Sequence, residues 1–489
     1  MTIRSTFAFV LSFCYFTLVS NAAALQSSRI DKNALPEIGV VAADAVSIDK
    51  EMLIGDVVMR QMRAQAPIIN DPVLTQYIQD LGNRLVIHAD NAKFPFTFFL
   101  INNADINAFA FYGGHIGVHT GLIYNADNES EVASVLAHEV AHVTQRHLAR
   151  RIQSAQRSSP LQIASMIGGI LLGIAARDPQ AGMAAISASQ AAAAQMQLNY
   201  TRSNEQEADR IGITMLARAG YDPTAAASFF GKLAAQMRVV SRPPARLLSH
   251  PLPESRIADA RIRANSLPAV RLPPSVAFHL AKARIQARYI YDKDIALEYY
   301  QNAVTERQLV PQAAQYGLAL ALLRSDKPEE AKVIIDELLA TDTSNLFYLD
   351  AATDIEIALG KADIAVEMLA EELKYSPRNA VVTLNLANAA IESGQLDYAI
   401  ELLRDFLLIN PDHMLSYQLL SDAYAKAKKY KEMHQMKAEV LNLLAAFPQA
   451  IDELQHAYNF TGDDHLEKQR IRARIQQLRD EKERLERLL

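Results

Sequence analysis

Cysteine is nearly absent from this 489-residue chain, and its absence excludes several kinds of chemistry. The one cysteine, Cys14, lies in an N-terminal apolar run without the small residues that flank a lipid-attachment site. A chain that has lost this run contains no thiol, so neither disulfides nor cysteine catalysis is expected. A strong charge imbalance is also missing, because the formal net charge is −6, and losing the positive charge of Arg4 changes −6 to −7. Such mild acidity argues against nonspecific nucleic-acid binding.

Long apolar runs are missing as well. Arg4 precedes the apolar run Phe7–Val19, which is shorter than the roughly 20 residues of a membrane-spanning helix. Small residues follow this run, and cleavage is expected after Ala22 or Ala24. Residues 1–24 are therefore predicted to be a secretory signal peptide. The remaining chain of about 465 residues is long enough for two or three domains.

A second apolar region comprises Leu161–Ala176 and the alanine-rich stretch Ala181–Ala194. Gln162 and Ser165 interrupt the region, and its apolar run is short for a membrane span. Buried helices are the default prediction. The alternative is a lid over an active-site cleft, or a plug that contacts a membrane from one side without crossing it.

The run His138-Glu139-Val140-Ala141-His142 is the strongest chemical signal in the chain. Residues four apart share one face of a helix, so both imidazoles can bind one metal ion while Glu139 takes a proton from water. A helix is expected to begin at Asn128, with Glu131 as the partner of a capping box. The alternative is a buried helix whose histidines only satisfy hydrogen bonds. The apolar stripe of this helix consists of Val132, Leu136, Val140 and Val143.

A zinc site needs a third protein ligand and leaves a fourth position for water. The extended motif with a third histidine six residues on is excluded, because Gln145 and Leu148 stand where glycine and histidine are required. His147 is one residue out of that register. The third ligand must therefore come from another part of the chain.

The segment Ser203–Asp209 is expected to begin a capped helix that runs to Gly220. Glu205 and Asp209 are four residues apart and share a face, so Glu205 could bind the metal while Asp209 orients a ligand histidine. Glu207 points elsewhere on this helix and is predicted to be solvated. The alternative for Glu205 is an ordinary first-turn acid that the helix dipole favours.

The His138–His142 motif followed by Asn204–Asp209 resembles the gluzincin metallopeptidases of the HtpX and CaaX prenyl protease types. The resemblance covers about residues 45–265, and Asn107–His115 is similar to the strand that precedes the zinc helix in that family. It implies an α+β zincin domain with a small sheet. It also implies one Zn²⁺ per chain, with Glu205 as the third ligand.

Unlike those two types, this chain has no set of transmembrane spans. It resembles instead the soluble, repeat-bearing branch of the β-barrel assembly-enhancing proteases. This resemblance implies a periplasmic zinc endopeptidase that degrades misfolded or stalled outer-membrane β-barrel proteins. The repeats would then dock onto the machinery that assembles such barrels.

The segment Ser249–Arg256 resembles the closing His-Pro element of the same family. The resemblance implies that His250 returns to the active site, as a fourth zinc ligand that keeps the enzyme latent or as a substrate-binding group. The alternative is a loop histidine before a helix that a proline starts. Arg256 is a candidate for stabilising the developing oxyanion.

The second half of the chain has a 34-residue period, which is typical of tetratricopeptide helix pairs that stack into a solenoid. Three repeats span about residues 312–412, with weaker ones before and after, and the charged segment 467–489 is expected to form a helix packed on the last repeat. The positions in phase are Ala331, Ala365 and Ala399; Ile335, Leu369 and Leu403; Leu339, Leu373 and Leu407; Gly360 and Gly394; and Pro377 and Pro411.

The predicted fold is therefore mainly α, a zincin metallopeptidase domain followed by a tetratricopeptide α-solenoid. The expected boundaries are 1–24 for the signal peptide, 25–267 for the peptidase, 268–462 for the repeats and 463–489 for the C-terminal helix. Ser266-Leu267-Pro268 and Pro273-Pro274 mark the linker between the halves.

Pro95–Ile101 and His115–Thr120 read as strands. His115 and His119 would lie about 13 Å apart on a strand, too far to share one ion. The strand that carries them is predicted to be an edge that pairs with an extended substrate backbone.

Two other classes of function compete with the enzyme. In the first, the repeats act as a chaperone or adaptor for outer-membrane assembly, with a latent protease site that His250 restrains. In the second, a zinc-stabilised scaffold has no turnover, and this class is disfavoured because a structural site has no use for Glu139.

Overall fold

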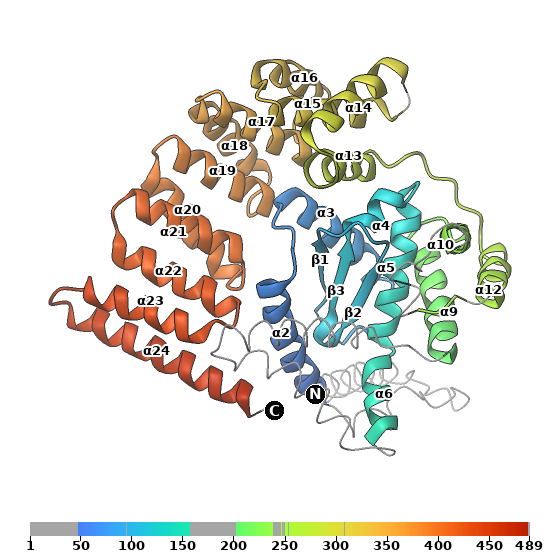
Figure 1. The fold of residues 1–489 in the computed structure, drawn as a ribbon, viewed down its shortest axis with the longest axis horizontal. Coiled ribbons are helices and arrows are strands. Elements are labelled where there is room, and N and C mark those ends of the chain that lie inside the picture. The colour runs from blue at the N-terminus through green and yellow to red at the C-terminus, as the bar shows by residue number, and fades with distance from the viewer. Residues whose placement is uncertain are drawn as a thin grey trace, which may run out of the picture. The chain divides into compact units, whose positions relative to one another are not determined.

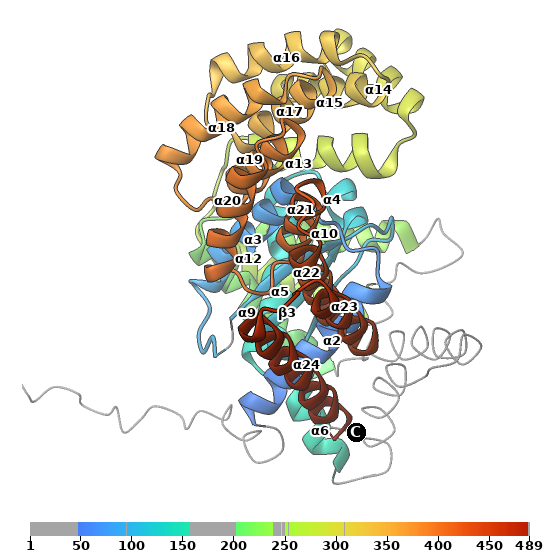
Figure 2. The same ribbon diagram turned by 90° about the vertical axis from the view of Figure 1, so that its left-hand side faces the viewer.

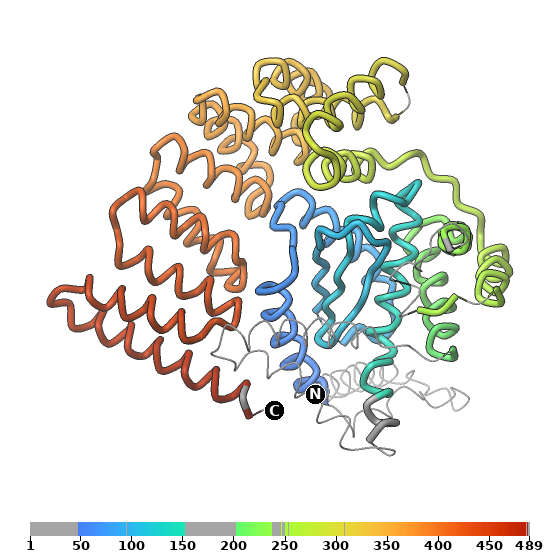
Figure 3. The backbone as a smooth tube through the Cα atoms, in the orientation of Figure 1, coloured from blue at the N-terminus to red at the C-terminus, as the bar shows by residue number. Residues whose placement is uncertain are grey.

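The computed structural model describes residues 47–93, 95–156, 202–237, 246, 250–252, 254–307 and 309–487. The predicted signal peptide, Cys14 and the apolar region 161–194 lie outside these residues. The described residues form one compact unit. Figure 3 follows the chain through it, first along the helices and strands of the peptidase half and then along successive helical hairpins.

The peptidase half contains α2 (Ile48–Gln65), α3 (Pro72–Val86), β1 (Thr97–Ile101), β2 (Ala108–Phe111), a 3₁₀ turn (Tyr112–Gly114), β3 (His115–His119), α4 (Thr120–Asn125), α5 (Glu129–Thr144), α6 (His147–Gln156), α9 (Arg202–Arg218), α10 (Thr224–Met237) and α12 (Glu254–Asn265). The helices that follow are α13 (Val276–Ile285), α14 (Lys293–Glu306), α15 (Pro311–Arg324), α16 (Pro328–Thr341), α17 (Leu346–Ala358), α18 (Ala362–Tyr375), α19 (Ala380–Glu392), α20 (Leu396–Ile409), α21 (Met414–Lys426), α22 (Tyr430–Leu443), α23 (Phe447–Asn459) and α24 (His465–Glu486).

The three strands form one small sheet in the order β1-β3-β2. β1 runs parallel to β3, and β2 runs antiparallel to it. The prediction that the strand from His115 is an edge is wrong, because β3 is the central strand and four of its five residues are buried. The outer strands are instead β1, which Ile68 bridges at Ile101, and β2, whose middle residues Phe109 and Ala110 are half-buried.

Helix α5 carries the His-Glu-x-x-His motif through the middle of the peptidase half. It begins as predicted at Asn128, whose side chain accepts the backbone N–H of Glu131 at 3.1 Å. The Glu131 carboxylate accepts the N–H of Asp127 rather than that of Asn128, which shifts the expected capping box by one residue. All 16 residues of α5 are buried, because the sheet, α3, α9 and α10 cover the helix between them.

A glycine lets α9 approach α5 closely. A Cβ atom on Gly212 would lie 3.1 Å from the backbone nitrogen of His138, tighter than most real Cβ contacts. The absence of a side chain at this crossing brings the first turn of α9 against the histidine face of α5. Glu205 lies in that turn and is 1% exposed.

The helices from α15 to α22 form four hairpins and confirm the 34-residue period. The second helices of these hairpins begin at Pro328, Ala362, Leu396 and Tyr430, each 34 residues after the last. The in-phase positions Ala365, Leu369, Ala399 and Leu403 belong to one buried cluster. The expected packing of the C-terminal helix is also confirmed, since Ile471, Leu478 and Leu485 of α24 pack with α23 residues.

The repeats lie against the peptidase half along its helices α2 and α3. Both Figure 1 and Figure 2 show the last hairpins beside α2, where Val57 packs into the same cluster as Phe447 and Ile471. Arg60 of α2 donates to the Asn442 carbonyl at 2.6 Å. Within the described part of the chain, no helix combines the length and the apolar character needed to cross a membrane.

Candidate metal centre

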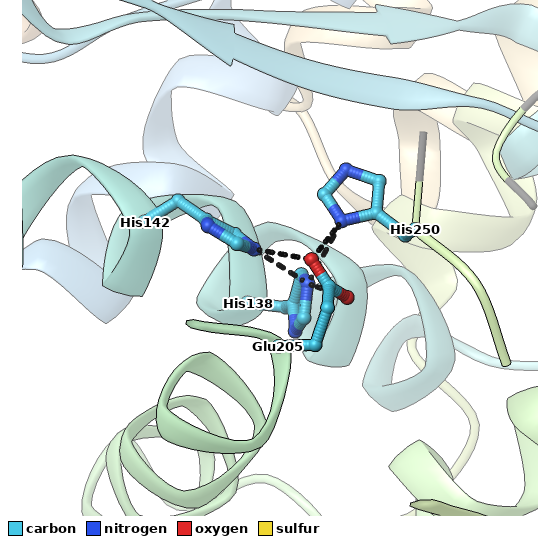
Figure 4. Close-up of side chains that lie close together, drawn as sticks. All are labelled: His138, His142, Glu205 and His250. Carbon is cyan, nitrogen blue, oxygen red and sulfur yellow. Dashed lines mark hydrogen bonds and ion pairs between the residues drawn. The ribbon is translucent and has the colours of Figure 1, made fainter. Parts of the chain in front are cut away.

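Three histidines and one glutamate converge at a single buried point. His138 and His142 come from α5, Glu205 from the first turn of α9, and His250 from the segment before α12. One ligand atom from each lies within 4.8 Å of the others. Figure 4 shows the four side chains turned toward one another, and each residue is at most 4% exposed.

The distances are those of a compact ligand set. The Nε2 atoms of His138 and His142 are 2.9 Å apart, as two imidazoles one turn apart share a face of α5. Glu205 Oε1 lies 3.3 Å from His142 Nε2, and Glu205 Oε2 lies 3.5 Å from His138 Nε2. His250 Nδ1 lies 2.9 Å from Glu205 Oε1 and 3.3 Å from His138 Nε2.

Asp209 and Arg256 lie behind this cluster. Asp209 Oδ1 is 2.9 Å from His138 Nδ1, the nitrogen that faces away from the convergence point. Arg256 donates from Nε and Nη2 to the two Asp209 oxygens at 2.7 and 2.8 Å, and its Nη1 lies 2.7 Å from Glu205 Oε2. The guanidinium therefore faces carboxylates in this structure, and the oxyanion role of Arg256 stays a prediction.

Glu139 has a partner that the sequence did not suggest. Arg246 is 2% exposed and donates from Nη1 to Glu139 Oε1 at 2.7 Å and to the Ala108 carbonyl at 3.2 Å. His250 Nε2 lies 3.6 Å from the same Glu139 oxygen. No spacing or motif singles out Arg246, because a lone arginine outside any motif resembles any surface arginine until the chain folds.

His147 and Glu207 were both discounted as site residues, yet both reach the centre's outer side. His147 Nδ1 lies 2.8 Å from His142 Nδ1, and His147 Nε2 lies 3.0 Å from Glu207 Oε2. Arg150 donates to the same Glu207 oxygen at 2.5 Å. Glu207 is half-buried, since α6 packs these two partners against it and leaves its side chain 29% exposed.

The charges of the cluster are strongly coupled. Burial, and then His138, lower the pKa of His142 well below that of a free imidazole. Burial also lowers the pKa of His250, whereas Asp209 and Glu205 overcome burial and raise the pKa of His138. Burial raises the pKa of Glu205, but the three histidines outweigh it and lower that pKa. Glu205 is therefore a carboxylate near neutral pH, ready to bind a cation.

The donor set fits zinc. Imidazole nitrogens and one carboxylate oxygen are the ligands of catalytic zinc sites, in the three-protein-ligand pattern that leaves room for water. Glu139 Oε2 is buried and has no hydrogen-bond partner among the described residues, so an acceptor is present beside the set. His115 and His119 do not belong to the cluster.

The helix-borne histidine pair that faces a glutamate on a second helix defines the class, a metalloendopeptidase, and comparison with known proteins agrees. Residues 72–264 match the model of peptidase family M48, and residues 356–416 match a tetratricopeptide repeat model.

Relatives with assigned names match almost the whole chain. The chain is 44% identical to the β-barrel assembly-enhancing protease of Escherichia coli K12, over 92% of each chain. It is 44% identical to a putative protein of the same name in Vibrio cholerae, over 93% of this chain and 94% of that one. A shorter match, 34% identical over 27% of this chain and 25% of the other, links it to the mitochondrial metalloendopeptidase OMA1 of Arabidopsis thaliana. The chain belongs to the family of β-barrel assembly-enhancing proteases.

Proposed function

We propose that this protein is a zinc-dependent endopeptidase of the periplasm that acts on misfolded or stalled outer-membrane β-barrel proteins and supports their assembly. The observation that carries the proposal is the convergence of His138, His142 and Glu205, with Glu139 on the same helix. In this proposal His138, His142 and Glu205 hold one Zn²⁺ ion. When bound, zinc would polarise a scissile carbonyl and acidify a water molecule.

The remaining residues have distinct roles. Glu139 accepts a proton from water with its carboxylate and delivers it to the leaving amine. Asp209 fixes the ring of His138 from behind, and Arg256 holds Asp209 in place across the short distances given above. Of the two outer strands, β1 already pairs at Ile101 with Ile68, so β2 is the strand assigned to pairing with an extended substrate backbone.

The second candidate function is a latent protease attached to a repeat adaptor. His250 favours it, because its Nδ1 lies 2.9 Å from Glu205 Oε1, at the place where a fourth ligand or a water would lie. Arg246 favours it too, since it occupies one oxygen of Glu139. We infer that the enzyme is restrained in this conformation and that the side chains of Arg246 and His250 must leave Glu139 and Glu205 before cleavage.

The setting and the partners follow from the leader and the repeats. A cleaved signal peptide at 1–24 would deliver the chain to the periplasm, and two of its relatives are named for β-barrel assembly. The repeat helices would contact the assembly machinery, as stacked helix pairs present extended binding surfaces.

Digestion of an unfolded β-barrel substrate by the purified mature chain tests the proposal. Wild type, Glu139→Gln and His250→Ala are compared at equal, measured zinc content. We expect cleavage by wild type, none by Glu139→Gln, and faster cleavage by His250→Ala. If none of the three cleaves although zinc is bound, the protein is an adaptor, and loss of barrel assembly on mutation of the repeats alone would support that function.

A further inference from the structure

We propose that His147 and Glu207 form a hydrogen-bonded chain that positions His142 as a metal ligand. The inference rests on the proposed function, because it takes His142 as one of the residues that hold zinc. It assigns a role to His147, which lies outside the motifs, and to Glu207, which lies within Asn204–Asp209 but had no role there. Neither residue contacts a reacting atom. They are positioning residues, and they act on the metal through His142.

The metal ligand His142 at one end of this hydrogen-bonded series and the Glu207 carboxylate at the other fix which nitrogen carries each proton. A ring that binds metal through Nε2 carries its proton on Nδ1, so His142 donates to His147 Nδ1 across 2.8 Å. His147 then carries its own proton on Nε2 and donates it to Glu207 Oε2 across 3.0 Å. Glu207 can only accept as a carboxylate, and it therefore selects the His147 tautomer that leaves Nδ1 free to accept.

A second partner holds Glu207 in this position. Arg150 donates from Nη2 to the same Glu207 oxygen at 2.5 Å. The bond to His147 is also shielded, since the His147 side chain is fully buried. Two donors thus meet at one carboxylate oxygen, and charge-assisted hydrogen bonds of this kind keep the acceptor in place.

The hydrogen-bonded series from His142 to Glu207 can form because the helix breaks immediately after the metal motif. Residues five apart on a continuous helix point about 140° away from each other, so His142 and His147 would not meet. Helix α5 ends at Thr144 and α6 begins at His147, with Arg146 between them in the left-handed region at φ 50°. Arg146 donates from Nε to Glu51 of α2 at 2.8 Å, which holds the break in place.

The two ligand histidines of α5 are therefore supported differently. His138 contacts the carboxylate of Asp209 directly, whereas His142 reaches Glu207 through a neutral ring. Both acids come from α9, which also supplies Glu205. One helix thus supplies the ligand Glu205 and the acids that support both histidines. A shift of α9 would therefore disturb all three proposed metal ligands.

Metal affinity of the purified mature chain tests the inference, measured by competition between the protein and a zinc chelator of known affinity. His147→Ala removes the acceptor, and we expect zinc to bind about 10- to 100-fold more weakly, the effect typical of residues that support metal ligands. His147→Asn places an amide oxygen near the position of Nδ1, and we expect it to restore affinity to within a few-fold of wild type. Asp209→Asn is the positive control and Gln206→Ala, at an exposed neighbour on α9, is the negative one.

A purely structural role for His147 would give a different pattern. It would lower the thermal stability of the metal-free chain equally in His147→Ala and His147→Asn, and would leave the added stability on zinc binding unchanged. We expect instead that the metal-free stability changes little and that the added stability on zinc binding falls in His147→Ala. We also expect an altered visible spectrum of the Co²⁺-substituted protein in His147→Ala alone.

The outcomes separate this inference from the proposed function. Wild type that binds no zinc would overturn the proposed function and the inference with it. Wild type that binds zinc, with an affinity that His147→Ala leaves unchanged, would overturn the inference and leave the peptidase standing. Equal weakening in His147→Ala and His147→Asn would also overturn it, because the acceptor would then not be what matters.

Discussion

At the scale of single residues, the unusual feature is the pair of side chains that contact Glu139. Its side chain is fully buried, and one carboxylate oxygen accepts from Arg246 while the ring of His250 lies 3.6 Å away. A buried charge needs such a partner, since an isolated carboxylate in an apolar interior is strongly disfavoured. The same pairing occupies an oxygen that a general base would offer to water.

Replacing Arg246 by glutamine should therefore release Glu139. We expect Arg246→Gln to raise kcat for an unfolded substrate by about tenfold, a small part of the 10²- to 10⁴-fold that general-base catalysis supplies. Steady-state cleavage at equal zinc content measures this, with Arg246→Lys as the control that keeps the positive charge and stays slow. A lower kcat for Arg246→Gln would mean that Arg246 holds Glu139 in its working position.

At the scale of elements, the geometry depends on one helix end. Arg146 adopts a left-handed backbone conformation, which costs a residue with a Cβ atom about 1 kcal/mol relative to glycine. The buried ion pair with Glu51 holds Arg146 there, and α2 thereby fixes the angle between α5 and α6. The strained backbone at Arg146 is thus maintained by its contact with Glu51 of α2.

A pair of substitutions at this position separates the backbone from the ion pair. Both Arg146→Ala and Arg146→Gly leave Glu51 buried without its partner, and both should destabilise the fold. Glycine tolerates positive φ, so we expect Arg146→Gly to be more stable than Arg146→Ala by about 1 kcal/mol in free energy of unfolding. Urea denaturation of the metal-free chain measures the difference. A more stable alanine variant would mean that the backbone at residue 146 does not keep its positive φ in the variants.

At the scale of the whole molecule, buried ionic contacts join the peptidase half to the repeats. Arg284 of α13 is 1% exposed and lies 2.6 Å both from Asp71, at the start of α3, and from Asp350 of α17. Breaking such a network by removing one partner is costly, because it leaves a charge buried and unpaired. The two halves are therefore expected to unfold together rather than independently.

Two half-buried histidines make this joint structure sensitive to acid. Burial lowers the pKa of His115 in β3 and of His413 before α21 to about 4 each, and the positive charge of Arg63 adds to the effect at both. In the unfolded chain both titrate near 6.5, so between about pH 6.5 and 4 the unfolded state binds more protons than the folded state. The free energy of unfolding should fall as pH is lowered through this window, by up to about 3 kcal/mol for each histidine.

Urea denaturation at pH 7.5 and pH 5, with a chelator present so that metal release does not contribute, tests this dependence. His413→Gln cannot take up a proton, and we expect it to lose less stability than wild type between the two values. An equal loss in both proteins would show that His413 does not contribute.

What the amino-acid sequence determined by itself is the part of this protein that depends on local, periodic spacing. The four-residue interval of His138 and His142, the cap at Asn128 and the 34-residue phase of the repeats each follow from the geometry of a helix. These features need no knowledge of distant segments. The solenoid half of the fold class followed from them, whereas the α+β zincin half followed from the resemblance of the two motifs to a known family.

Only the tertiary structure decided the contacts that arise between distant segments. The sequence could not place Arg246 against Glu139, because 107 residues separate them and no regular element joins them. It could not bring His147 to His142 either, since this needs positive φ at Arg146 and a partner on α2. The central position of β3 likewise depends on pairing with both β1 and β2, which the pattern along one strand does not encode. Local spacing thus fixed the residues that can hold a metal, and long-range packing decided how those residues are supported and restrained.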